Sequence, residues 1–148
     1  MERWLGGYAG LIFAALRILT GMMYWMHGTS KVFGFPPGAR SGALQDLTSL
    51  LGVAGLLEVV LGVCIITGFK ASYAAFVASG EMAAAYFMTQ FPFAILPIYQ
   101  PRGILGESAV FNCFFFLYVA AAGPGPYSVD AWLSSRRRPP SPPRPDSV

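Results

Sequence analysis

The chain has 148 residues, of which 55% are hydrophobic and only 11% are charged, and its formal net charge is +3. A water-soluble domain usually carries charge on about 25% of its residues, so this composition excludes an ordinary soluble domain and predicts a membrane protein. We therefore expect the lipid bilayer to be the principal partner of the chain, and we expect no nucleic acid partner.

Four apolar segments follow one another along the chain, at about residues 5–27, 47–68, 71–90 and 106–122. Roughly 20 helical residues cross a hydrocarbon core of about 30 Å, so the first three segments are long enough and the fourth is short. The predicted fold is all-α: a four-transmembrane-helix bundle in one domain, residues 1–130, followed by a tail, residues 131–148.

The first segment resembles a signal peptide because Arg3 precedes a hydrophobic run, but the run is longer than a signal core and contains Arg17, which favours a retained helix. Lysine and arginine are more frequent at the N-terminus, at Lys70 and in the tail than in the two other loops. The positive-inside rule therefore predicts that both termini are cytoplasmic.

The connections differ in character. Residues 28–46 contain glycine and proline and are expected to hold a short interfacial helix, whereas Phe69–Lys70 allows only a tight hairpin. Residues 91–105 are proline-bearing but apolar, and are expected to lie in the interface or against the bundle. The end of the chain, residues 134–148, has a disordered or polyproline-like composition.

Three charged residues, Arg17, Glu58 and Glu81, interrupt apolar segments near their centres, where charge is costly. Each lies on a face of small residues at helical spacing, which lets helices approach closely. These faces and a comparable one in the fourth segment are predicted to meet in the bundle interior: Gly7, Gly10, Ala14, Gly21, Tyr24 and Gly28; Gly52, Gly55 and Gly62; Ala74, Ala78 and Ala85; Glu107, Phe111, Phe114, Tyr118 and Ala121.

Two readings of these charges stay open. Arg17 could be a structural clamp held by one or both carboxylates, because buried charges need pairing. Alternatively, one of Glu58 and Glu81 is protonated or the two share a proton, because like charges repel at low dielectric, and this proton serves a bound redox ligand. Glu58, Glu81 and His27 are therefore the candidate catalytic residues.

A second polar cluster is expected at the outer boundary, from His27, Lys31 and Glu107. These residues could simply contact lipid headgroups, or they could bind a quinone head group with Tyr24 or Trp25 packed beside it. Arg17, Tyr24, His27, Lys31 and Glu107 are the candidate ligand-binding residues. His27 is the only histidine, which excludes bis-histidine haem and a three-histidine metal site within one subunit, so no metal site is predicted.

Cys64 and Cys113 lie at different predicted depths, on the order of 14 Å apart by helix rise, so they are expected to be free, buried thiols. No flavin, haem, iron–sulfur or nicotinamide motif is visible, and no intrinsic cofactor is expected. A quinone is the one candidate ligand.

Several short motifs resemble the DoxX family of small four-helix membrane proteins. They are Arg17-Ile18-Leu19 with Gly21, His27-Gly28 with Lys31, Gly55-Leu56-Leu57-Glu58 with Gly62, Gly80-Glu81-Met82-Ala83, and Gly106-Glu107 with Leu117-Tyr118. The resemblance covers roughly residues 16–130. It departs from the family near Thr89-Gln90, where many members have a further histidine, and this chain also lacks a thiol pair.

The resemblance implies a bacterial inner (cytoplasmic) membrane protein associated with redox systems. The favoured expectation is an auxiliary subunit of a larger membrane redox or electron-transfer complex, which contacts other membrane protein subunits through its helices and its tail. The alternative is a quinone-reactive oxidoreductase subunit that uses the His27 cluster and the two carboxylates. A small transporter or proton path is a third reading, which rests on the buried charges alone.

Overall fold

The computed structural model describes residues 2–36, 46–90 and 105–137, and within these ranges the chain is helical without strands. In chain order the elements are α1 (Glu2–Leu5), the 3-10 turn η1 (Gly6–Tyr8), α2 (Ala9–Phe33), α3 (Leu50–Thr67), α4 (Ala71–Gln90), α5 (Leu105–Ala122) and α6 (Val129–Arg137). The all-α prediction is therefore confirmed for the described ranges.

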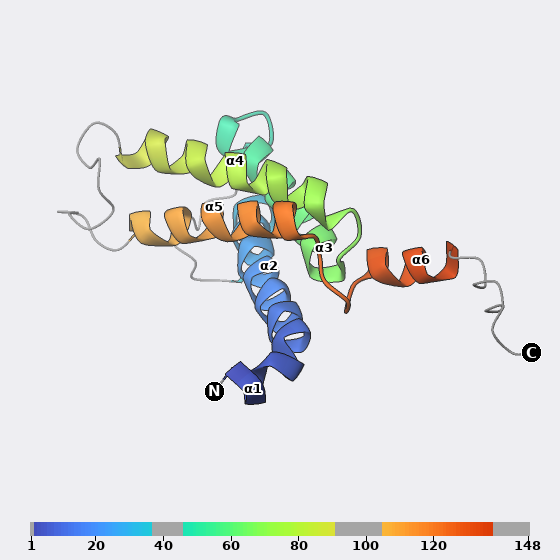
Figure 1. Cartoon of the computed structure of the whole chain (residues 1–148). Helices are drawn as coiled ribbons and strands as arrows, with labels where there is room; N and C mark the ends of the chain where they lie inside the picture. Colours follow the sequence, from blue (N-terminus) through green and yellow to red (C-terminus); the bar gives the residue numbers. More distant parts are fainter. Residues whose placement is uncertain (1, 37–45, 91–104, 138–148) are drawn as a thin grey trace, which may run out of the picture.

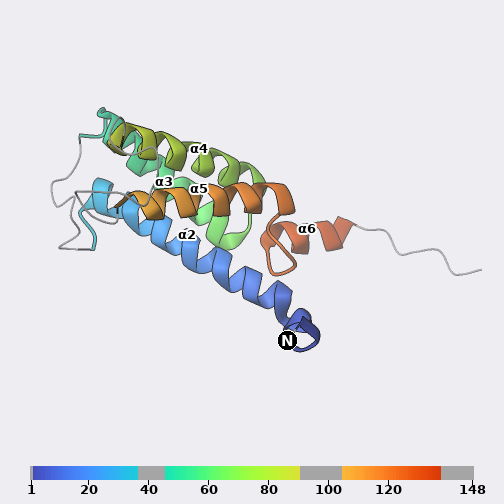
Figure 2. The ribbon, with the colours of Figure 1, turned by 60° about the vertical axis from the view of Figure 1, so that its left-hand side comes forward.

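The four long helices form two closely packed pairs, α2 with α3 and α4 with α5, which are joined through the contact of α3 with α4. Figures 1 and 2 show α4 and α5 running side by side, while the N-terminal part of α2 diverges from the other helices. The short helix α6 lies beyond the end of this bundle, at the same end as the N-terminal part of α2 (Figure 2).

Glycines set the distance between α2 and α3. A Cβ atom on Gly28 would lie 2.7 Å from the carbonyl oxygen of Gly55, and one on Gly62 would lie 2.8 Å from the Cβ of Trp25. Neither contact is possible for a larger residue, so the two backbones touch along this seam. The predicted small-residue face is confirmed in α3, where Gly52, Gly55, Glu58 and Gly62 are all buried, and in α2 from Ala14 onward.

The hydrophobic core lies where α4 faces α3 and α5. Alanines of α4 pack there against larger side chains of the neighbouring helices. The buried residues of this core are Tyr24, Ile65, Ala74, Ala75, Ala78, Phe115, Phe116 and Val119. The predicted face of α5 is wrong, because Phe111, Phe114 and Tyr118 are exposed and Phe116 and Val119 are buried instead. Aromatic residues occur all around α5, so they mark no face.

The predicted hairpin between α3 and α4 is confirmed. Gly68 ends α3 in the left-handed conformation, at φ 72°, and its N–H donates to the carbonyl oxygen of Cys64. Lys70 also has a positive φ, of 46°, immediately before α4 begins at Ala71. The connection is therefore as short as the sequence indicated, and it holds a lysine in a conformation that favours glycine.

The first connection begins later than predicted, because α2 continues to Phe33 and ends at the left-handed Gly34. At the start of α3, the Ser49 hydroxyl accepts a hydrogen bond from the N–H of Gly52, at 3.1 Å. Hydrogen bonds from Thr48 to the exposed Asp46 carboxylate lower the pKa of Asp46. The predicted interfacial helix within residues 28–46 and the loop at residues 91–105 fall largely outside the described residues.

The C-terminal segment departs from its predicted disorder, because α6 carries helix through Ser134 to Arg137. Its Asp130 carboxylate accepts hydrogen bonds from the N–H groups of Lys70, at 2.9 Å, and Ala71, at 3.2 Å. This carboxylate satisfies N–H groups that the first turn of a helix leaves unpaired, so α6 is attached to the start of α4. Residues 138–148 lie outside the described part.

In the part of the chain that the structure describes, two helices are long and apolar enough to cross a membrane, Gly6–Phe33 and Leu50–Thr67, and a third apolar stretch, Gly106–Ala122, is shorter. The remaining long helix, α4, has the length of a span but includes Ser72, Ser79 and Glu81. Both cysteines, Cys64 and Cys113, are free and half-buried.

Candidate functional site

A buried ion pair joins α2 to α3. The Lys31 ammonium donates to both carboxylate oxygens of Glu58, at 2.8 and 2.7 Å, and the Glu58 side chain is only 3% exposed. Gly55 makes room for it, since a Cβ atom there would lie 3.0 Å from the Cβ of Lys31. The absence of a side chain on Gly55 thus lets the lysine stem pass inward to a carboxylate that the α3 backbone holds in place.

A second buried contact joins α2 to α4. The Tyr24 hydroxyl donates a hydrogen bond to the Oε2 atom of Glu81. Tyr24 is 1% exposed, and its ring meets that of Phe116 edge-on, with centroids 5.1 Å apart. The Phe116 contact fixes the orientation of the phenol, so its hydroxyl is directed at the carboxyl group.

These contacts bring one ammonium, one phenol and two carboxyl groups from three helices into two hydrogen-bonded pairs. We call Tyr24, Lys31, Glu58 and Glu81 the polar network. The network contains two carboxyl groups, and its single lysine can balance only one negative charge. The second carboxyl group has no counter-ion in the network, so it can carry a proton. Sharing of this proton between Glu58 and Glu81 stays a prediction.

Arg17 is not part of this network, and the predicted clamp between Arg17 and the two glutamates is wrong. Its guanidinium donates to two backbone carbonyl oxygens that follow α5, those of Pro124 and of Tyr127, the latter at 2.7 Å. Arg17 is 1% exposed, and its Nε has no hydrogen-bond partner among the described residues. Arg17 therefore connects α2 to the segment that leads into α6.

The register of α2 against α3 explains this difference. A Cβ on Gly68, at the end of α3, would lie 2.8 Å from the guanidinium of Arg17, whereas Glu58 faces Gly28. The prediction placed Arg17 and Glu58 at the same depth because each lies near the middle of its apolar segment. This assumes that the centres of α2 and α3 lie side by side. Instead α2 extends past the end of α3, so Lys31 lies where Arg17 was expected.

The predicted outer cluster is not assembled. His27 lines a shallow cavity of about 220 Å³ with Met23, Met26, Ser30 and Pro36. Lys31 turns inward to Glu58, and within the described ranges the exposed Glu107 of α5 forms no ion pair with His27 or Lys31. Of the candidate ligand-binding residues, His27 alone lines this cavity.

Two contacts were missed by reasoning from the sequence. Tyr24 was expected to pack beside a ligand, but its partner is Glu81. Tyr24 lies seven residues before Lys31, on the same face of α2, and this spacing could have indicated that both side chains face the other helices. The Ser79 hydroxyl donates to the carbonyl oxygen of Cys113, at 2.9 Å, and connects α4 to α5.

Among the described residues, no group of three or more His, Cys, Asp or Glu side chains could hold a metal ion.

Comparisons with known proteins identify the family of the chain. The DoxX family model matches residues 12–90, which include α2, α3, α4 and the whole polar network. An uncharacterized protein of Haemophilus influenzae is 33% identical over 123 residues, a match that covers 83% of this chain and 91% of that protein. No solved structure matches the chain. The chain therefore belongs to the DoxX family of membrane proteins.

Proposed function

We propose that this DoxX protein is an auxiliary subunit of a larger membrane redox or electron-transfer complex, in a bacterial inner membrane with both termini cytoplasmic. The observation that carries the proposal is the closed polar network. Lys31 is bonded to Glu58 and Tyr24 to Glu81, so each of these groups already has a partner within the chain. Such a network fixes the mutual positions of the helices, which is a structural task.

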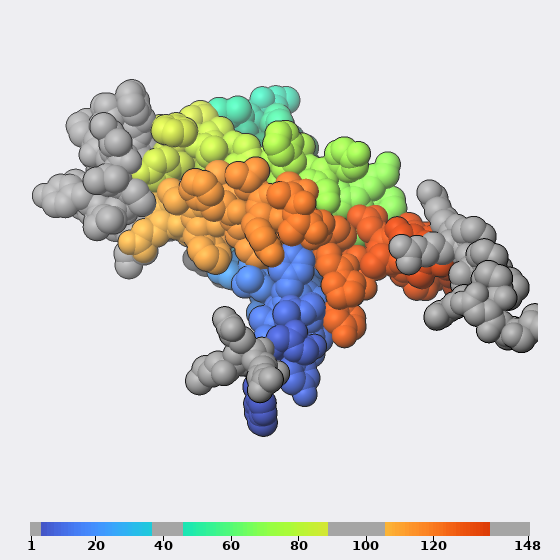
Figure 3. Space-filling model, in the orientation of Figure 1, coloured from blue at the N-terminus to red at the C-terminus, as the bar shows by residue number. Residues whose placement is uncertain are grey.

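The N-terminal part of the chain supplies a surface for another membrane subunit. Trp4 is 84% exposed, and Tyr8, Leu11 and Ile12 are also exposed, because α1, η1 and the start of α2 extend past the helices with which α2 packs. Figure 3 shows it projecting from the body of the molecule. Lipid can cover an apolar helix, but the glycines of η1 leave its backbone open to a neighbouring helix.

The redox character of the complex rests on the resemblance to the DoxX family. A redox enzyme needs a cofactor to carry electrons, and no cofactor motif is visible in this sequence. In the proposed complex another subunit carries the electrons, and this chain supports its assembly in the membrane.

Purification of the tagged chain from its native membrane in mild detergent tests the proposal. We expect pigmented redox subunits to co-purify in fixed stoichiometry. Gly7→Leu fills an open position on the projecting segment and should release them, whereas Gly80→Leu on α4 is a matched control, since nothing lies within 4 Å of a Cβ at either position. A lone, monodisperse protein, or equal loss in both variants, would contradict the proposal.

A second candidate function is a quinone-reactive oxidoreductase subunit. It is favoured by the cavity beside His27, which lies four residues before the network lysine on α2. Reduction of a quinone to a quinol takes two electrons and two protons. One proton would come from the network carboxyl groups and one from water at the membrane surface, and a partner subunit would supply both electrons. Quinone that co-purifies with the isolated chain, and that is lost in His27→Ala, would favour this function.

A further inference from the structure

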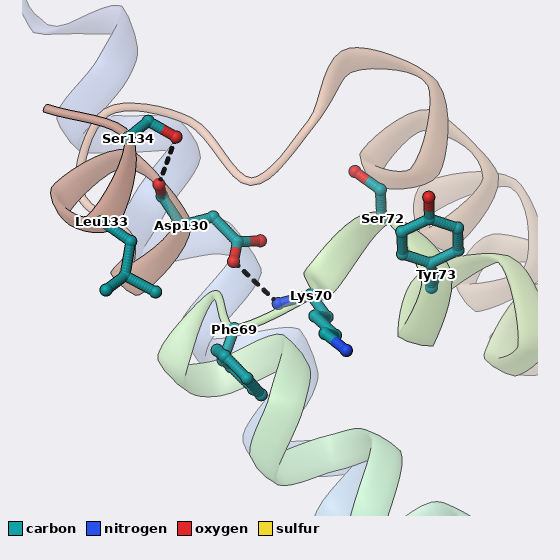
Figure 4. A pocket seen from close by; sticks show the side chains of 7 residues that line it. All are labelled: Phe69, Lys70, Ser72, Tyr73, Asp130, Leu133 and Ser134. Carbon is teal, nitrogen blue, oxygen red and sulfur yellow. Dashed lines mark hydrogen bonds between the residues drawn. The ribbon is translucent and has the colours of Figure 1, made fainter. Parts of the chain in front are cut away.

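A second cavity, of about 340 Å³, lies at the end of the bundle between the α3–α4 turn and α6 (Figure 4). Its apolar part comes from Phe69, Tyr73 and Leu133, and its polar part from Lys70, Ser72, Asp130 and Ser134. None of these residues belongs to the polar network. The cavity therefore has an amphipathic lining of its own, and it shares no lining residue with the cavity beside His27.

The only carboxylate in this lining is already engaged. Asp130 accepts from the backbone N–H groups of Lys70 and Ala71, so its charge faces the positive end of the α4 helix dipole. The Lys70 side chain points away from Asp130 in Figure 4, and its ammonium lies 6.0 Å from the centroid of the Phe69 ring. Among the described residues, Lys70 has no carboxylate partner, so its positive charge is available to a ligand.

Lys70 occupies a backbone position that would suit glycine. Its φ of 46° lies in the left-handed region, which is unfavourable for a residue with a Cβ. Gly68, two residues earlier, has φ 72° and shows the usual solution for such a turn. Residues other than glycine in the left-handed region are concentrated at functional sites. The conformation of Lys70 therefore suggests that its side chain has a role besides forming the turn.

A membrane span that ends with α3 at Thr67 places this cavity beside the lipid headgroups. The apolar helix α3 ends at Thr67, and Lys70 follows three residues later. Tyr73 is 77% exposed beside it, and aromatic residues concentrate at the interface between hydrocarbon and headgroups. A ligand at this position meets a cation, two hydroxyl groups and an aromatic surface.

We propose that this cavity binds the phosphate group of an anionic phospholipid. The phosphate contacts the ammonium of Lys70 and the hydroxyl of Ser72, and an acyl chain runs along Phe69 and Tyr73 toward the bilayer core. The free charge on Lys70 favours an anionic headgroup over a zwitterionic one. The amphipathic lining favours a phospholipid over inorganic phosphate, which would use only the polar part.

Native mass spectrometry of the detergent-purified full chain, titrated with phosphatidylglycerol or phosphatidylcholine, tests the proposal. We expect a preference for phosphatidylglycerol, weakened by roughly fivefold in Lys70→Gln and kept in Lys70→Arg. Lys70→Gly removes the ammonium while suiting the backbone, so it should show the same loss if Lys70→Gln folds poorly.

Arg136→Gln is the matched control. Arg136 stacks on the Trp132 ring, 4.0 Å from its centroid, and does not line the cavity. An equal loss in Arg136→Gln and Lys70→Gln would mean diffuse attraction to basic residues and would overturn the proposal. Inorganic phosphate that displaces phosphatidylglycerol at equal concentration would overturn it as well, because a free phosphate would then be the preferred ligand.

Discussion

The Lys31 ammonium contacts both oxygens of the Glu58 carboxylate, and this pair closes the seam between α2 and α3. Lys31→Met leaves the Glu58 carboxylate buried without a counter-ion, which costs about 3–5 kcal/mol of stability. Thermal unfolding in detergent, followed by tryptophan fluorescence, should show a large fall in Tm. The double variant Lys31→Met with Glu58→Gln should recover much of it, and wild-type stability in Lys31→Met alone would contradict the pairing.

The hydrogen bond from Tyr24 to Glu81 makes a separate prediction. Tyr24→Phe keeps the edge-on contact with Phe116 but removes the donor, so it should cost about 1–3 kcal/mol. Adding Glu81→Gln should then change little, because the two residues act on one contact. A double-mutant cycle on the same unfolding signal measures this coupling; strictly additive losses would mean that the two side chains do not interact.

Two glycines in long helices, Gly28 of α2 and Gly80 of α4, should respond differently to alanine. Gly28→Ala places a Cβ 2.7 Å from backbone atoms of Gly55 and Val59, so α2 and α3 must separate. Gly80→Ala meets nothing within 4 Å and should be neutral or stabilising by up to about 1 kcal/mol, because alanine favours helix. Yield and Tm in detergent are the readouts, and comparable losses in both variants would be inconsistent with the seam.

Arg17 should control the attachment of α6. Arg17→Met removes both donors to Pro124 and Tyr127 while keeping a long apolar stem, so the segment after α5 should detach. Limited trypsin digestion should then cut at Arg136 faster than in the wild type. Phe76→Ala, which changes an exposed residue of α4, serves as the control; unchanged cleavage in Arg17→Met would argue against this role.

The helical faces could be predicted from the sequence because small residues recur at helical spacing in α2, α3 and α4. Gly55, Glu58 and Gly62 were found in this way, and all three are buried. The same reasoning failed for α5, where bulky residues such as Phe114 and Phe116 lie on opposite sides and no small face separates them. Periodicity identifies a face only where the two sides of a helix differ in kind.

The partners of the buried charges could not be predicted, because they depend on how far one helix is shifted along another. Sequence spacing fixes the face on which Arg17, Lys31 and Glu58 lie, but it does not fix the offset between α2 and α3. That offset comes from backbone contacts such as Gly28 with Gly55. It puts Lys31 beside Glu58 and leaves Arg17 at the end of the bundle.

The two acceptors of Arg17 have a consequence for biosynthesis. Pro124 and Tyr127 follow Arg17 by 107 and 110 residues, so the ribosome makes this arginine long before it makes the carbonyl groups that bind it. While the first helices enter the bilayer, the guanidinium must remain hydrated or paired with a lipid phosphate. The two hydrogen bonds of Arg17 can therefore form only after the end of the chain has been made.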